Sequence, residues 1–181
     1  MELYLIPAYQ ETIRNRGYRR IIKAAEKAGY TVEVLPLQIQ NKKFSDVVAE
    51  GISIINQDKS KQKAILGFST GALIAHEISA RIPIEKGLFC SVSPILGADI
   101  PKNMRAFIKL FGEESMDELK KSEYGISLAE QPVFFCGDKE GRKLIGRTKK
   151  LSQLSCGQTI LIKNNEHELN ADYVKEVVKF L

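Results

Sequence analysis

The sequence is poor in the residues that staple small proteins or hold metal ions. Its 181 residues include only 3 cysteines and 2 histidines, and tryptophan is absent. Cys90, Cys136 and Cys156 are an odd, widely spaced set, and two of them lie within apolar runs. This favours reduced thiols packed in the core of a cytoplasmic protein. We therefore expect no disulfide framework, no metal site and no cofactor.

Long apolar stretches and dense basic patches are also lacking. No apolar run is long enough to cross a bilayer, and residues 1–7 lack the basic start of a signal peptide. The net charge of +5 is spread in pairs such as Arg19-Arg20 and Lys149-Lys150, which indicates a solvated surface. We therefore expect a cytoplasmic protein that binds neither membranes nor nucleic acids.

What the sequence does contain is an alternation of strand and helix patterns. Short apolar runs bounded by glycine, proline or charge predict strands over residues 3–6, 31–35, 63–68, 87–92, 132–136 and 158–162. Segments with the helical 3.6-residue rhythm lie between most of them, beginning with a predicted helix over 11–28. Continuous hydrophobicity indicates strands that are buried on both faces. We predict one α/β domain over 1–181, a three-layer, doubly wound, mostly parallel six-stranded sheet with helices on both faces.

One segment departs from this rhythm. Residues 93–131, between the fourth and fifth predicted strands, show no strand signal but carry an amphipathic piece that includes Phe107 and Phe111. We predict a crossover helix, with a small lid as the alternative, because loops at the carboxyl edge of a parallel sheet carry substrate contacts. In either case we expect Phe107 and Phe111 to border a substrate pocket for an uncharged, short to medium acyl group.

The most informative motif lies at the end of the third predicted strand. Residues 67–71 read Gly-Phe-Ser-Thr-Gly and lead directly into a helical segment. This is the GxSxG pattern of a nucleophile elbow, and it identifies Ser69 as a candidate activated serine. The two glycines leave room for a very tight turn between strand and helix. Chance alone supplies such a pentapeptide in roughly one chain in twenty of this composition, so the other residues of the site must support it.

A base and an acid for Ser69 follow two later strands. A serine hydroxyl needs a base to take its proton, and the base needs an acid to orient it. His167 follows the last predicted strand, whereas His76 lies two turns down the helix after Ser69 and is expected to be a partly buried or surface residue. Asp138 and Glu140 both follow the fifth strand, and either could orient His167.

With serine, acid and histidine in this order, each after a strand, the chain resembles the α/β-hydrolase superfamily. The resemblance covers essentially the whole chain, which lacks the first two strands of that family's usual sheet. It implies a serine hydrolase that cleaves a small carboxylic ester or thioester through a Ser-His-acid triad and an acyl-enzyme. In the family the acid commonly stands three residues after the strand-ending glycine, the place that Glu140 holds, with Asp138 as the rival.

The resemblance also implies an oxyanion hole made of two backbone amides. One is the amide after the nucleophile, here Thr70, and the other lies in the loop after the first strand, residues 7–10. The family often has His-Gly in this loop, where this chain has Pro7-Ala8. The second donor is therefore expected to be the Tyr9 amide, with Ala8 as the next candidate.

Two other functions fit parts of the pattern. A catalytically inactive protein could keep this fold for binding or scaffolding, which the departure in the oxyanion loop favours and the presence of all three reactive residue types disfavours. A flavodoxin-like or Rossmann nucleotide binder would use residues 67–71 as a phosphate loop. It requires a GxGxxG turn or a lysine beside the loop, and neither is present.

Overall fold

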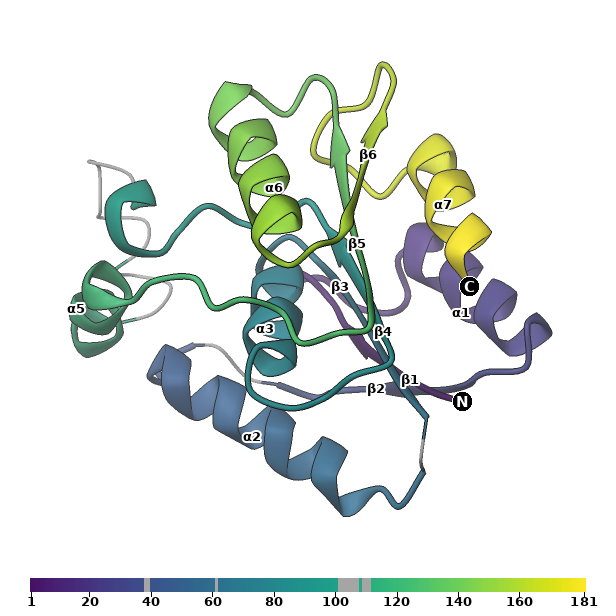
Figure 1. The fold of residues 1–181 in the computed structure, drawn as a ribbon, viewed down its shortest axis with the longest axis horizontal. Coiled ribbons are helices and arrows are strands. Elements are labelled where there is room, and N and C mark those ends of the chain that lie inside the picture. Colours follow the sequence, from purple (N-terminus) through teal and green to yellow (C-terminus); the bar gives the residue numbers. More distant parts are fainter. Residues whose placement is uncertain (38–39, 61, 101–107, 109–111) are drawn as a thin grey trace.

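Six parallel strands form the sheet at the centre of the molecule (Figure 1). The structure, a computed structural model, describes residues 1–181 except 38–39, 61, 101–107 and 109–111. The strands are β1 (Glu2–Ile6), β2 (Thr31–Val34), β3 (Lys63–Phe68), β4 (Lys86–Cys90), β5 (Gln131–Gly137) and β6 (Gln158–Ile162). Their order is β2-β1-β3-β4-β5-β6, and every neighbouring pair is parallel. The predicted fold class is confirmed.

Helices cover both faces of this sheet (Figure 1). One face carries α1 (Arg16–Lys27) and α7 (Ala171–Val177), and the other carries α2 (Phe44–Gln57), α3 (Thr70–Ser79) and α6 (Arg142–Leu154). The strand order reverses between β1 and β3, and ligands of doubly wound folds bind at the carboxyl ends of the strands beside such a reversal. No helix within the described ranges is long and apolar enough to span a membrane.

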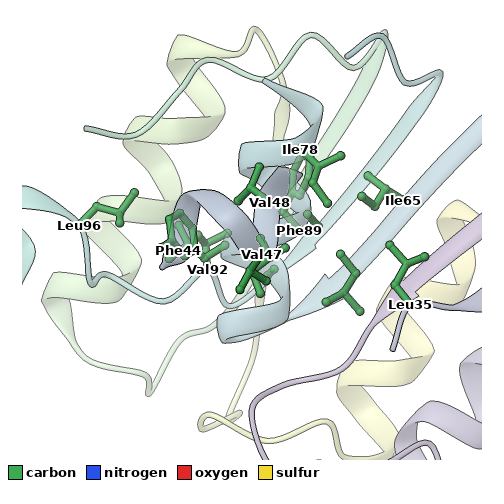
Figure 2. Close-up of a cluster of buried hydrophobic side chains, with 14 of the residues drawn as sticks. Leu35, Phe44, Val47, Val48, Ile65, Ile78, Phe89, Val92 and Leu96 are labelled. Carbon is green, nitrogen blue, oxygen red and sulfur yellow. The ribbon is translucent and has the colours of Figure 1, made fainter. Parts of the chain in front are cut away.

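The core is split into two apolar layers by the sheet. Along β1, Leu3 and Leu5 belong to the cluster beneath α1 and α7, whereas Tyr4 and Ile6 belong to the cluster beneath α2 and α3. Alternate residues of a strand point to opposite faces, so a strand covered on both sides must be apolar throughout. Figure 2 shows part of the second cluster, with labelled side chains Leu35, Phe44, Val47, Val48, Ile65, Ile78, Phe89, Val92 and Leu96.

The first helix begins later than predicted. It starts at Arg16, after an Asn15 cap whose side chain accepts a hydrogen bond from the Gly17 amide at 2.9 Å. The preceding residues are not helical because the Tyr18 hydroxyl holds them as a loop, donating to the Glu11 carboxylate at 2.5 Å. This loop after β1 lies at the carboxyl edge of the sheet, beside the strand β3 that leads into Ser69.

The described part of residues 93–131 is tied to the main body at several points. It contains the short 3-10 helix η1 (Gly97–Asp99) and α5 (Glu113–Lys121). Ser115 Oγ of α5 donates to the Lys42 carbonyl at 2.7 Å, and the Asp99 carboxylate pairs with Arg147 of α6. A second 3-10 helix, η2 (Val178–Phe180), follows α7. Whether the segment 93–131 acts as a crossover or as a lid stays a prediction.

Candidate active site

Ser69 lies on a sharp turn between the end of β3 and the start of α3. Its backbone has φ 56° and ψ −118°, a conformation that costs a residue with a side chain about 1–3 kcal/mol. Gly67 and Gly71 permit the turn, because a Cβ on Gly67 would collide with the Gly71 carbonyl and a Cβ on Gly71 with the Ile6 carbonyl. The turn therefore presents the Ser69 hydroxyl at the carboxyl edge of the sheet.

Ser69, His167 and Glu140 are joined by a continuous chain of hydrogen bonds. His167 Nε2 lies 2.8 Å from Ser69 Oγ, and His167 Nδ1 lies 2.6 Å from Glu140 Oε2. The His167 ring packs against Phe68, with ring centroids 5.1 Å apart, and its side chain is 41% exposed. The Glu140 side chain is completely buried. A substrate can therefore reach the serine and the histidine, while the acid is shielded from water.

Of the two rival acids, only Glu140 contacts His167. Glu140 follows a turn in which its amide donates to the Gly137 carbonyl at 3.2 Å, and this turn directs its side chain back toward the sheet. Asp138 is exposed, and its side chain makes no hydrogen bond to any residue that the structure describes. Its amide instead donates to the Ile162 carbonyl at 3.0 Å. The geometry therefore favours Glu140 as the partner of His167.

The number of protons that each group carries determines which atom donates in each of these hydrogen bonds. An ionised carboxylate only accepts, so His167 Nδ1 carries the proton and Nε2 accepts from Ser69 Oγ. Ser93 Oγ lies 3.1 Å from Ser69 Oγ. Because the Ser69 proton is committed to His167, Ser93 is the donor in that contact. This tautomer leaves His167 ready to take the proton of Ser69.

Two buried residues that are not part of the Ser69–His167–Glu140 hydrogen bonds hold Glu140 in place. Ser91 Oγ and the Gly137 amide both donate to Glu140 Oε1, each at 2.6 Å. The Ser91 hydroxyl has one proton and donates it to Glu140. It therefore accepts in the 2.7 Å hydrogen bond with the Tyr173 hydroxyl. Burial, reinforced by the nearby Cys90 and Glu140, raises the pKa of Tyr173 well above its ordinary value. Tyr173 therefore stays protonated and remains a donor.

Sequence reasoning missed Ser91, Ser93 and Tyr173. Ser91 and Ser93 follow β4, the strand beside β3, so a search for polar residues at every strand end would have included them. Ser91 also has a φ of 52°, which a sequence pattern does not reveal. Tyr173 lies in α7 and carries no sequence signal that separates it from other core tyrosines.

The loop that carries Glu140 and the loop that carries His167 are bonded together through their backbones. The Asp138 amide donates to the Ile162 carbonyl and the Lys139 amide to the Asn165 carbonyl, both at 3.0 Å. The Asn165 side chain in turn donates to the Asn170 side chain at 2.8 Å, and Asn170 caps α7. Glu140 and His167 are thus carried by two loops that are hydrogen-bonded to each other.

The two residues whose amides were expected to form an oxyanion hole, Thr70 and Tyr9, contact each other through the Thr70 side chain. Thr70 is the first residue of α3, so its amide has no acceptor within the helix. The Tyr9 amide donates to Thr70 Oγ1 at 2.8 Å, and the Ala8 amide donates to the Tyr18 hydroxyl at 2.9 Å. The structure therefore brings the Tyr9 loop against Thr70, but both loop amides already have side-chain acceptors.

Two hollows border this site. One, of about 580 Å³, lies beside the loop after β1 and is lined in part by Tyr9 and by Ile74 of α3. The other, of about 420 Å³, lies between His167 and the start of α1. The expected pocket residues Phe107 and Phe111 fall outside the described residues, so their contact with substrate stays a prediction.

The prediction that His76 is a partly buried or surface residue is wrong, because it is completely buried. Its Nδ1 lies 3.2 Å from Glu77 Oε1, and its ring packs edge-on against Phe89 and Phe134. The reason is the position of α3, which lies over the middle of the sheet with neighbouring elements on every side. His76 therefore lies in the core, about two helical turns along α3 from Ser69.

The cysteines are free thiols in the structure. Cys90 and Cys136 are buried in strands, and Cys156 is exposed. Burial, with the Glu140 carboxylate nearby, raises the pKa of Cys136 to about 12. Within the part of the chain that the structure describes, no group of three or more histidine, cysteine, aspartate or glutamate residues could hold a metal ion.

Comparison with known proteins identifies the fold. No protein-family model and no curated protein matches the sequence. Est1E from Butyrivibrio proteoclasticus, solved with ferulic acid bound, matches with a TM-score of 0.80 at 12% identity, over 99% of this chain and 85% of its own. MGS-MChE2, an α/β-hydrolase from the sediment metagenome of the Mar Chica lagoon, matches with a TM-score of 0.74 at 11% identity, over 99% of this chain and 88% of its own. MenH from S. aureus matches with a TM-score of 0.66 at 14% identity, over 99% of this chain and 90% of its own. This chain therefore has the fold of the α/β-hydrolase superfamily.

Proposed function

We propose that this protein is a serine hydrolase that cleaves a small carboxylic ester or thioester. The observation that carries the proposal is the chain of hydrogen bonds from Ser69 through His167 to Glu140. The fold alone is compatible with many activities. A partly exposed serine bonded to a histidine, which is bonded in turn to a buried carboxylate, is the arrangement that activates a hydroxyl as a nucleophile.

In the proposed reaction, His167 Nε2 takes the proton of Ser69 as Ser69 Oγ attacks the acyl carbon. The Thr70 amide and a second donor beside Tyr9 stabilise the oxyanion of the tetrahedral intermediate. His167 then passes its proton to the leaving alcohol or thiol, which leaves an acyl-enzyme. A water molecule that His167 deprotonates releases the acid and restores Ser69. Glu140 stabilises the imidazolium in both halves of the reaction.

The test is covalent labelling by a fluorophosphonate probe, together with a screen of nitrophenyl esters and acyl thioesters of increasing chain length. We expect wild-type protein to be labelled on Ser69, as located by mass spectrometry of the labelled peptide, and to prefer uncharged short to medium acyl groups. Because the Est1E structure holds ferulic acid, a feruloyl ester belongs in the screen. Failure of the folded wild-type protein to react with the probe would refute the proposal.

A second candidate function is binding or scaffolding without turnover. The observation that favours it is the commitment of the Ala8 and Tyr9 amides to side-chain acceptors, which leaves the loop after β1 with neither amide free for an oxyanion. This function predicts a protein that binds ester-like ligands but neither reacts with the probe nor releases product. The labelling experiment therefore separates the two candidates.

Tyr173→Phe is expected to lower kcat by about 2- to 10-fold, the usual effect of losing one neutral hydrogen bond. The ring still fills its place in the core, but Ser91 loses its donor and holds Glu140 less firmly. KM for the best ester in the screen should stay near the wild-type value. The matched control is Tyr4→Phe, since Tyr4 is equally buried and donates to Asp58 on a part of the molecule remote from His167. Equal losses of kcat in the two variants would contradict a specific role for Tyr173.

A further inference from the structure

Thr70, the residue that follows Ser69, contacts the loop after β1 through its side-chain hydroxyl. The Tyr9 amide, the expected second oxyanion donor, donates to Thr70 Oγ1 at 2.8 Å. The Ala8 amide donates to the Tyr18 hydroxyl, and that hydroxyl is itself bonded to Glu11. Neither loop amide can therefore meet a substrate oxygen without first breaking a hydrogen bond that the structure shows.

Thr70 still has a proton to give. A hydroxyl group carries one proton and can accept through its lone pairs. Thr70 Oγ1 accepts from Tyr9, and its own O–H finds no acceptor among the residues that the structure describes. Thr70 directly follows Ser69 and carries two donors, its backbone amide and its side-chain hydroxyl.

The surroundings hold this hydroxyl in position. Gly71 packs so closely on the Ile6 carbonyl that no side chain fits between the start of α3 and the end of β1. The Tyr18 hydroxyl also anchors the loop after β1, because it accepts a hydrogen bond from the Ala8 amide. Donors that are fixed before the substrate binds stabilise developing charge without the cost of reorganisation.

We propose that the Thr70 hydroxyl is the second oxyanion donor and that the Tyr9 amide supports it. This inference rests on the proposed serine hydrolase function. By donating to Oγ1, the Tyr9 N–H polarises the hydroxyl and strengthens the hydrogen bond that its proton makes. No covalent bond of Thr70 forms or breaks in the reaction. The substrate carbonyl oxygen accepts hydrogen bonds from the Thr70 hydroxyl and amide as it becomes negative, while the proton of Ser69 goes to His167.

The opposite arrangement is a hydroxyl that merely blocks the Tyr9 amide and rotates away when substrate binds. The two arrangements predict opposite effects of removing the hydroxyl. If it donates, its loss weakens catalysis. If it blocks, its loss frees the Tyr9 amide and leaves catalysis unchanged or faster.

The test compares Thr70→Val, which keeps the shape but loses the hydroxyl, with Thr70→Ser, which keeps the hydroxyl. For the best ester in the screen, Thr70→Val should lower kcat by about 10²- to 10³-fold, as the loss of one oxyanion donor does in other acyl-transfer enzymes. KM should change little, and Thr70→Ser should stay close to wild type. A trifluoromethyl ketone, which forms a tetrahedral adduct with an active serine, should lose affinity for Thr70→Val by a factor similar to the loss in kcat.

Several outcomes would overturn the inference. Wild-type or higher kcat in Thr70→Val means that the hydroxyl blocks the amide, and equal losses in Thr70→Val and Thr70→Ser mean a purely structural role. If Thr70→Val does not fold by thermal melting, Thr70→Ala replaces it with the same expectations. Absence of probe labelling in wild type refutes the hydrolase proposal and this inference together. If the probe labels the wild-type protein but kcat of Thr70→Val equals that of wild type, this inference alone is refuted.

Discussion

Replacing Ser69 with alanine is expected to lower kcat by at least about 10⁴-fold for every ester and thioester that the wild-type protein cleaves, since loss of the nucleophile disables a triad as a unit. His167 and Glu140 would keep their mutual hydrogen bond but would have no hydroxyl to activate. Labelling by the fluorophosphonate probe should disappear at the same time. The measurement is kcat/KM for the best substrate, with intact-protein mass spectrometry for the label.

The control for this substitution is Ser53→Ala. Ser53 is an exposed serine in the middle of α2, remote from the sheet edge that carries Ser69, so this variant should hydrolyse and label like wild type. Thermal melting should show both variants folded. Labelling of Ser69→Ala at the wild-type rate would mean that the probe modifies another residue, and the assignment of the nucleophile would then be wrong.

Replacing Glu140 with glutamine is expected to lower kcat by about 10⁴-fold, comparable to the loss when the acid of a serine protease triad becomes an amide. Glutamine fills the same buried space, but its amide nitrogen can donate to His167 Nδ1. That bond favours the tautomer with the proton on Nε2, which cannot take the proton of Ser69. KM should change little, because Glu140 is buried and does not face the substrate.

Asp138→Asn is the matched control, because it makes the same chemical change two residues away on an exposed side chain. We expect kcat close to wild type. The two variants should be compared on one substrate over one pH series, after thermal melting has shown that each is folded. A large loss in Asp138→Asn with an active Glu140→Gln would assign the acid to Asp138 and would mean that the loop rearranges when substrate binds.

The fold could be predicted well because its central strands are buried on both faces. Such strands are almost wholly apolar, so the run at 63–68 marks β3 to the residue. The start of α1 could not be predicted in this way. Residues 11–15 have a composition that suits a helix, but the Tyr18 hydroxyl holds them as a loop by donating to Glu11 and accepting from the Ala8 amide. Such tertiary contacts leave no local pattern in the sequence.

The sequence could predict only those site residues that directly follow a strand. Ser69 follows β3 and His167 follows β6, and the carboxyl ends of parallel strands lie at one edge of the sheet. The choice of Glu140 over Asp138 depends on a four-residue turn, closed by the hydrogen bond from the Glu140 amide to the Gly137 carbonyl. Ser91 reaches Glu140 because β4 and β5 pair with Cys90 opposite Phe135. That register, like the bond between Tyr9 and Thr70, becomes visible only in three dimensions.

The backbone bonds between the Glu140 loop and the His167 loop have a mechanical consequence. The two loops are bonded directly to each other, whereas Ser69 lies on the separate turn between β3 and α3. We therefore expect a displacement of the Glu140 loop to carry the His167 loop with it, so that the distance between Glu140 and His167 varies less than the distance between Ser69 Oγ and His167 Nε2.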